Sequence, residues 1–372
     1  MQPKKHALPD IVRATSDFEK WASRHVKLIP SDLSLKHREM ANSPFLFLRG
    51  TFYRWAQWWP IVCPELARAP RLLAVGDLHI ENFGTWRDLE GRLIWGVNDF
   101  DEVWPAAYTV DLVRLLASAY LGIAEHHLSL SRKEASRAIE EGYRDSLAKG
   151  GNPFVLAEQH RWLRLLALNK LRDPVTFWEK ILACPRYKGP LPNVVAKALK
   201  SALPCLEEKS ELKSRIAGLG SLGHPRIVAL FSWHGAHIAR EAKQLTPSAW
   251  IWARHLQTEE ILSHKLVQRA VRIQDPHVHF AEHWIVRRLA PDCCHIEIST
   301  LPVGRDEEKL LYYMGWETAN IHLGSPKVIP GAKRDLAARK GRWLHKAAKT
   351  MLKATFNDWE VWRRNWVRSA GT

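Results

Sequence analysis

The segment AVGDLHIENFGTW, residues 74–86, places an aspartate, a histidine, a glutamate and an asparagine within six positions, directly after the apolar run RLLAV. Phosphoryl transfer needs one carboxylate near the acceptor hydroxyl and oxygen ligands that hold Mg²⁺ against the phosphates. Asp77 and Asn82 carry these groups, and the segment VNDFDE adds Asp99 and Asp101. We therefore predict Asp77 as the base, Asn82 and Asp99 as metal ligands, and Asp101 as a reserve ligand.

The spacing of these residues supports this interpretation. Protein kinases use Asp-x-x-x-x-Asn followed by another aspartate after a short hairpin, which is the order found here. The non-catalytic alternatives are an Asx-type turn at Asp77–Asn82 and a surface strand end at Asp99 and Asp101.

A glycine-rich segment, GLGSLG, supplies Gly218, Gly220 and Gly223 around Ser221. A dinucleotide-binding fold requires a helix directly after such glycines, but HPRIVALF follows, and its proline and β-branched residues predict a strand. A glycine loop between two strands is the arrangement that covers ATP phosphates with backbone N–H groups. We predict that these four residues bind the nucleotide; a plain glycine-rich hairpin is the alternative.

The elements that must position these residues follow from apolar spacing. Leu72–Val75 predicts a short strand before the first loop, and a turn at Asp88–Gly91 predicts a hairpin with Leu93–Val97 on its second arm. Helical spacing dominates residues 14–60 and 110–203.

The predicted organisation is α+β, with helices and strands in separate segments. Residues 1–209 form a helical lobe with the catalytic and metal loops, 210–303 a small β-rich nucleotide lobe, and 304–372 helices that return to the helical lobe. The glycine loop comes about 140 residues after the catalytic loop, the reverse of the usual kinase order. We therefore expect a circularly permuted kinase-like fold, which chains tolerate when their termini lie at the surface.

Charge and cysteine usage limit location and partners. The net charge is +16, and the segment from Lys327 onward contributes twelve basic residues against three acids. This basic C-terminal segment predicts either an anionic partner, such as nucleic acid, or a solvated helix face. No apolar run is long enough to cross a membrane, the N-terminus lacks a secretory pattern, and five cysteines without framework spacing fit reduced thiols. We expect a cytoplasmic protein.

A competing metal signal lies at His279, Glu282 and His283, which have the H-x-x-E-H spacing of some zinc enzymes. On a helix this spacing could place two imidazoles on one zinc. Pro276 before it and the strand-like WIVRRL after it argue against a helix. The cysteine pair before His295 is a weaker signal.

Two resemblances sharpen these expectations. GDLHIEN and NDFDE resemble the catalytic and metal segments of the aminoglycoside phosphotransferase and choline kinase branch of kinase-like enzymes. That resemblance implies that Asp111, in TVDLVRLLAS, steadies the catalytic loop, with Arg114 beside it and His79 supporting the loop from within.

The second resemblance is to domain of unknown function family 2252, an uncharacterised bacterial family regarded as kinase-like. The blocks KHREMANSPFLFLRG, GDLHIENFG, NDFDEVWPAAYTVDLVRLLAS, GLGSLG and YYMGWETANIHLGS occur in the family's order. This resemblance implies a lysine in the strand after the glycine loop, where IAREA places Arg240. Lys243 is three residues further on and must face the opposite side of a strand. We therefore expect Arg240 to bind the phosphates.

These observations predict an ATP- and Mg²⁺-dependent phosphotransferase, or a nucleotidyl transferase, acting on an unidentified acceptor. The alternative is a catalytically inactive kinase-like binding module, favoured by the arginine in place of lysine and by the basic C-terminal segment. A zinc hydrolase is the third interpretation.

Overall fold

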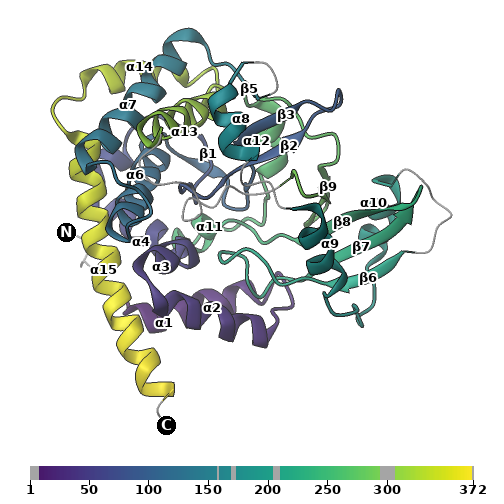
Figure 1. Cartoon of the computed structure of the whole chain (residues 1–372). Helices are drawn as coiled ribbons and strands as arrows, with labels where there is room; N and C mark the ends of the chain where they lie inside the picture. The colour runs from purple at the N-terminus through teal and green to yellow at the C-terminus, as the bar shows by residue number, and fades with distance from the viewer. Residues whose placement is uncertain (1–7, 157–158, 169–172, 204–209, 294–305, 371–372) are drawn as a thin grey trace.

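The computed structural model describes residues 8–156, 159–168, 173–203, 210–293 and 306–370. Helices surround two small sheets in the larger part of the molecule, and a five-stranded sheet projects to one side (Figure 1). The helices are α1 (Ile11–Ala22), α2 (Pro30–Asn42), α3 (Pro44–Gly50), α4 (Phe52–Val62), α5 (Pro64–Ala67), α6 (Thr109–Ala124), α7 (Arg132–Lys149), α8 (Arg161–Leu168), α9 (Pro174–Leu182), α10 (Asn193–Ser201), α11 (Ala249–Ala253), α12 (Ser263–Arg269), α13 (Glu307–His322), α14 (Ile329–Ala338) and α15 (Trp343–Ala370).

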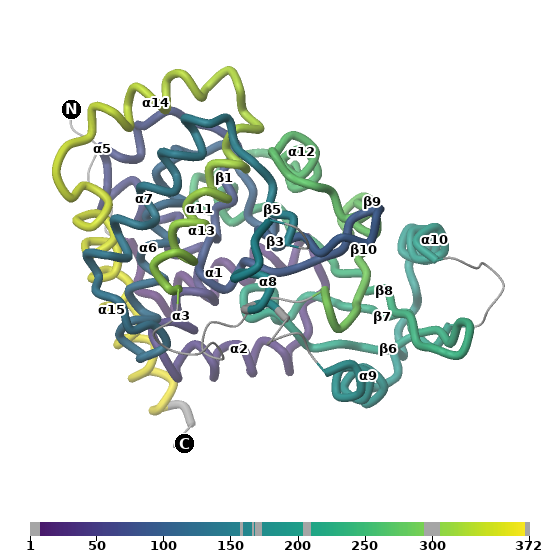
Figure 2. Tube along the Cα trace, turned by 45° about the horizontal axis from the view of Figure 1, so that its top comes forward, coloured from purple at the N-terminus to yellow at the C-terminus, as the bar shows by residue number. Residues whose placement is uncertain are grey.

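The largest hydrophobic core lies in the helical part. Helix α6 is buried along almost its whole length, and α15 runs down one side of the molecule against α1, α2, α4 and α6 (Figures 1 and 2). Local signals set the helix ends: Ser131 and Glu134 form a capping box at the start of α7, and Asp10 and Ser43 cap α1 and α3.

Helices α7 and α13 approach unusually closely because each presents a glycine to the other. A Cβ atom at Gly142 would lie 1.8 Å from the carbonyl oxygen of Tyr312, and one at Gly315 would lie 2.1 Å from that of Ile139. Both neighbours are backbone atoms, so only glycine permits this helix–helix distance.

Two small sheets frame the first predicted loops. β1 (Arg71–Ala74) pairs antiparallel with β4 (Trp104–Ala107), and β2 (Phe83–Arg87) pairs antiparallel with β3 (Leu93–Val97), which also pairs with β5 (Phe154–Val155). The segments between these strands, 75–82 and 98–103, therefore begin and end on fixed strands.

The five-stranded sheet has the order β6-β7-β8-β10-β9 and is antiparallel throughout. Its strands are β6 (Glu211–Ser214), β7 (Arg226–Trp233), β8 (Ala236–Gln244), β9 (His279–Ala281) and β10 (Trp284–Leu289). Helix α9 packs on one face through Phe177 and Ile181, and α10 packs on the other through Val195 and Leu199.

The mixture of helices and antiparallel strands confirms the α+β prediction, and the predicted hairpin is formed by β2 and β3. The three predicted segments, 1–209, 210–303 and 304–372, do not coincide with the packing units of the structure. Helices α9 and α10, placed in 1–209, cover the five-stranded sheet, whereas α11 and α12, placed in 210–303, belong to the main core. The run CHIEISTLP, residues 294–302, predicts a further strand, and it lies outside the described residues. None of the described helices is long and apolar enough to cross a membrane.

The α7–α13 contact predicts an unusual effect of alanine. Gly142→Ala would raise helix propensity by about 1 kcal/mol in an open helix. Here the added methyl group meets a backbone carbonyl, so we expect the free energy of unfolding to fall by about 1–3 kcal/mol. Urea denaturation measures this, and the exposed neighbour Glu141→Ala should stay within about 0.5 kcal/mol of the wild type. A Gly142→Ala protein more stable than the wild type would contradict the close approach.

Candidate active site

One face of helix α6 holds the loop of residues 75–82. Asp111 is fully buried, and its carboxylate accepts the N–H groups of Val75 at 2.7 Å and Gly76 at 2.9 Å. One turn further along the helix, Arg114 binds Asp77, and one turn further again the Ser118 hydroxyl accepts the N–H of Ile80 at 3.0 Å. Residues spaced by three and four share a helix face, so the sequence of α6 sets the path of this loop.

Gly76 is required where the loop leaves β1. Its φ is +83°, and a Cβ atom there would lie 2.5 Å from the carbonyl oxygen of Glu102. The glycine therefore lets the loop pass against the segment that carries Asp99 and Asp101.

Asp77 lies at the centre of the site. Arg114 Nε donates to Asp77 Oδ1 at 2.8 Å, and the same guanidinium donates to the Leu48 carbonyl at 2.7 Å. Burial raises the pKa of Asp77, and the charge of Arg114 opposes that rise. The second carboxylate oxygen points towards the glycine loop, since Oδ2 lies 3.6 Å from the position of a Cβ atom at Gly220. One oxygen of Asp77 is thus held in place and the other faces the loop.

Asn82 closes the loop on itself. Its Oδ1 accepts the N–H of His79 at 3.0 Å, and its carbonyl oxygen accepts the N–H of Asn98 at 3.0 Å. Asn82 Oδ1 therefore has a structural partner within the loop, but an amide oxygen has a second lone pair for a metal. His79 supports the turn from within, because its Nδ1 accepts the N–H of Glu81 at 3.2 Å.

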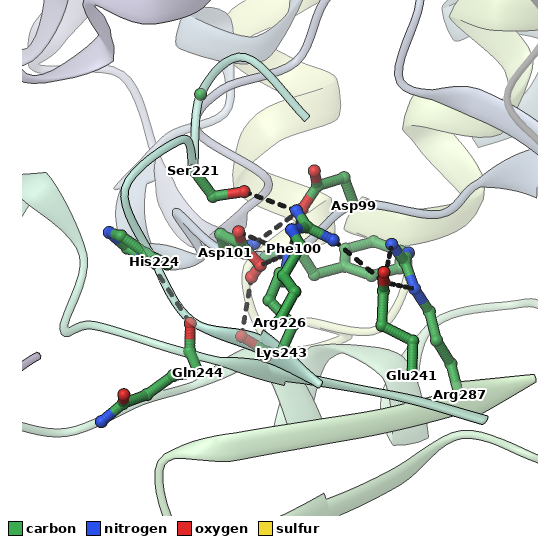
Figure 3. A network of polar contacts seen from close by, with 12 residues as sticks. Asp99, Phe100, Asp101, Ser221, His224, Arg226, Glu241, Lys243, Gln244 and Arg287 are labelled. Carbon is green, nitrogen blue, oxygen red and sulfur yellow. Dashed lines mark hydrogen bonds and ion pairs between the residues drawn. The ribbon is translucent and has the colours of Figure 1, made fainter. Parts of the chain in front are cut away.

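The acidic segment after β3 meets the five-stranded sheet. Lys243 of β8 is 2% exposed, and its Nζ donates to both carboxylate oxygens of Asp101 at 2.6 Å and lies 3.6 Å from Asp99 (Figure 3). Burial raises the pKa of Asp101, against the effect of this lysine.

The glycine loop joins β6 to β7 and is attached to helix α2. Lys36 Nζ donates to the Gly220 carbonyl at 3.0 Å, and the Ile29 N–H donates to the Gly223 carbonyl at 2.9 Å. Arg226 Nη2 donates to the Ser221 hydroxyl at 2.7 Å (Figure 3). These contacts bring Gly218 and Gly220 to the wall of a cavity that also contains Asp77 and Asp99. Ser221 lines a smaller cavity that shares Gly220, Asp77 and Asp99 with the first.

The structure corrects the prediction for Arg240. Its guanidinium donates to the carbonyls of Ala202 at 2.9 Å and Ala239 at 3.0 Å, on the sheet face covered by α10. Lys243 and Arg240 do lie on opposite faces of β8, as expected, but Lys243 is the residue that faces the carboxylates. The register of β8 against β7 and β10 decides the face, because it places Lys243 opposite Arg226 and Arg240 opposite Ala229.

The cavity has a volume of about 560 Å³ and lies between the loops and the sheet. Asp77, Asn82 and Asp99 line it from the loops. The basic side chains that line it are Arg49, Arg215, Arg226 and Arg287. A cavity of this size with carboxylates on one wall and guanidinium groups on another suits a ligand that carries several phosphates and a metal ion.

Sequence reasoning missed Lys36 and the arginines. Lys36 is 5% exposed, and burial lowers its pKa. It stands in the KHREM block, whose position in the chain gave no indication of contact with residues about 180 positions later. Arg215 and Arg226 flank the glycine loop on both sides, and this pairing of basic residues is the signal that could have revealed them.

The zinc motif does not form a helix. His279 lies on strand β9, and Glu282, with φ of 52°, makes the turn into β10. Within the described ranges no group of three or more His, Cys, Asp or Glu side chains is placed to hold a metal ion. His295 lies outside the described residues.

The basic C-terminal segment lies away from the cavity. Lys346, Lys349, Lys353, Arg363 and Arg364 are exposed on α15, on the side of the molecule opposite the five-stranded sheet (Figure 1). Asp358 of the same helix is buried and accepts hydrogen bonds from Arg54 and Trp58.

Residues 27–169 match the model of a family described as "Uncharacterized protein conserved in bacteria (DUF2252)". For that part of the chain the match confirms the resemblance indicated by the motifs. It includes both acidic loops and α6, whereas the glycine loop lies beyond it. No curated protein and no solved structure matches the chain.

The role of Asp111 can be measured through stability. Asp111→Ala leaves two buried N–H groups without their acceptor, at about 1–3 kcal/mol each, so we expect unfolding to become easier by about 2–6 kcal/mol. Asp17→Ala is the control, because its ion pair with Arg13 is exposed and contributes about 0–1 kcal/mol. Denaturant titration of the two variants should separate them clearly; equal effects would show that Asp111 does not hold the loop.

Proposed function

We propose that this chain is an ATP- and Mg²⁺-dependent phosphotransferase of kinase-like arrangement. One observation carries the proposal: a glycine loop between two antiparallel strands lies over Asp77 and Asp99, and a buried lysine from the next strand reaches the same acidic segment. In protein kinases a glycine loop, a strand lysine and two such acidic loops perform phosphoryl transfer together.

Each residue has a role that fits its surroundings. Asp77 would accept the proton of the acceptor hydroxyl, since Arg114 holds one of its oxygens and leaves the other towards the loop. Asn82 and Asp99 offer hard oxygen ligands, which suit Mg²⁺ when substrate phosphates complete the shell. Lys243 takes the phosphate-facing role that had been predicted for Arg240.

The order of elements supports a circular permutation of the kinase arrangement. The acidic loops precede the sheet in the chain, and α13 follows the sheet and returns to the main core. There His322 of α13 lies 2.9 Å from Asp111, so the helix after the sheet supports the loop before it.

The alternative function, a catalytically inactive binding module, is favoured mainly by Arg240 at the position where kinase-like enzymes have a lysine. The position of Lys243 weakens that argument. Lys243 stands beside Asp99 and Asp101 and supplies the compact charge that kinases use. Nucleotidyl transfer would use the same residues and is distinguished by its product, because it releases pyrophosphate rather than ADP.

Nucleotide binding is the first test. At about 100 times its Kd, Mg²⁺–ATP should stabilise the fold by about 2.7 kcal/mol. For a chain of this length that corresponds to a rise in Tm of roughly 3–4 °C by thermal denaturation. The rise should shrink when EDTA removes the metal. The absence of a shift with millimolar nucleotide would contradict the proposal.

Paired substitutions separate the base from the metal ligand. Asp77→Asn should lower ATP turnover by about 10²–10⁴-fold and leave nucleotide affinity nearly unchanged, because a base acts on the acceptor. Asp99→Asn should weaken both turnover and Mg²⁺-dependent binding. Coupled assays for ADP and pyrophosphate measure turnover and identify the reaction. Wild-type turnover in Asp77→Asn would show that another group is the base.

A further inference from the structure

Three arginines converge on one buried carboxylate beside the glycine loop. Glu241 of β8 is fully buried, and it accepts hydrogen bonds from Arg215 Nη1 at 2.5 Å, Arg226 Nη1 at 2.9 Å and Arg287 Nη2 at 2.9 Å. Figure 3 shows Arg226 and Arg287 meeting at Glu241. The three cations hold the pKa of Glu241 well below its usual range despite its burial.

Glu241 supplies one negative charge to three guanidinium groups, and Asp99 and Asp101 also act on Arg287 from the loops. Together with Lys243, which pairs with Asp101, four cations meet three carboxylates, so one positive charge is in surplus. Arg226 is 5% exposed, and Arg215 and Arg287 have side chains only 17% and 21% exposed. Unneutralised charge removed from water is costly, and an anion in the adjacent cavity would offset that cost. Glu241 orients all three groups and balances one of their three charges.

The cluster lies at the junction of two cavities. All three arginines line the polar cavity with Gly218, Gly220 and Asp99. Arg215 and Arg287 also line a second cavity, whose apolar wall is formed by Phe100, Val267, Val278, Phe280, Ile285 and Leu289. A ligand with an apolar end and a polyanionic end could contact both cavities, with its phosphates beside the arginines and near Asp99.

We propose that Arg215, Arg226 and Arg287, which all donate hydrogen bonds to Glu241, form a polyphosphate site. The identity of the ligand as a nucleoside di- or triphosphate rests on the proposed function; the anion site itself does not. Guanidinium groups donate charge-assisted hydrogen bonds to phosphate oxygens, and their charge does not depend on a metal. Part of the affinity should therefore survive without Mg²⁺ and should increase with the number of phosphates.

The experiment is calorimetric titration of the full chain with inorganic tripolyphosphate, ADP and ATP, each with Mg²⁺ and with EDTA. Wild-type protein should bind tripolyphosphate in EDTA, and ATP more tightly than ADP. Arg287→Gln and Arg215→Gln should weaken both tripolyphosphate and ATP by about tenfold or more, because each removes a charged hydrogen-bond donor. Arg287→Lys keeps the positive charge but lacks the forked donors of a guanidinium group. Its affinity for tripolyphosphate and ATP should therefore lie between those of the wild type and Arg287→Gln.

Arg240→Gln is the matched control, because it removes an arginine from the same sheet on the opposite face. It should retain wild-type affinity for tripolyphosphate. Circular dichroism of every variant checks folding, and the lysine variant keeps the test valid if the glutamine variant of Arg287 unfolds.

The outcomes separate this inference from the proposed function. Wild-type ATP affinity in Arg287→Gln and Arg215→Gln, or no tripolyphosphate binding in EDTA, would overturn the inference and leave the phosphotransferase proposal intact. Suppose instead that the variants lose tripolyphosphate binding and that the wild type binds ATP no more tightly than tripolyphosphate. That result would support the anion site and contradict the nucleotide assignment.

Discussion

The site depends on the buried carboxylate of Asp111. Placing a carboxylate at zero exposure is costly unless its oxygens accept hydrogen bonds, and here the donors are the N–H groups of Val75 and Gly76 and the imidazole of His322. His322 in turn contacts the Tyr143 hydroxyl at 2.9 Å. These bonds tie α6, α7, α13 and the loop after β1 together, so the loop has a fixed position before any ligand arrives. Arg114 and Ser118 continue the same helix face along that loop.

The acidic and basic groups of the site come from different parts of the chain. The helical part supplies Asp77 and Asp99, and the five-stranded sheet supplies Lys243 and the three arginines around Glu241. Buried charges are tolerated when they are paired, which explains why Asp77 has Arg114 and Asp101 has Lys243. The surplus positive charge on the sheet faces the carboxylates on the loops. A metal–phosphate ligand, which contains charges of both signs, complements both walls.

The sequence pattern predicted those secondary-structure elements that depend mainly on neighbouring residues. The hairpin of β2 and β3 and the strands on either side of the glycine loop form where turn residues and alternation place them. Local sequence also argues against a zinc-binding helix at His279–His283, because Pro276 precedes this segment and the strand-like run WIVRRL follows it. Packing of α9 and α10 on the five-stranded sheet was not predictable from their amphipathic spacing. Such spacing shows that a helix has an apolar face but not which surface covers it.

The sequence by itself supplied the candidate residues for the proposed reaction, Asp77, Asn82, Asp99 and the glycine loop, because their types and spacings match the kinase pattern. It also determined that Arg240 and Lys243 face opposite sides of β8, because strand side chains alternate with a period of two. Only the tertiary structure decided which of the two faces the carboxylates, since that depends on the pairing of β8 with β7 and β10. The positions of Lys36 and the three arginines were decided in the same way. Residues separated by more than 100 positions come into contact only through tertiary packing. The local spacing of apolar residues does not specify which distant segments pack together.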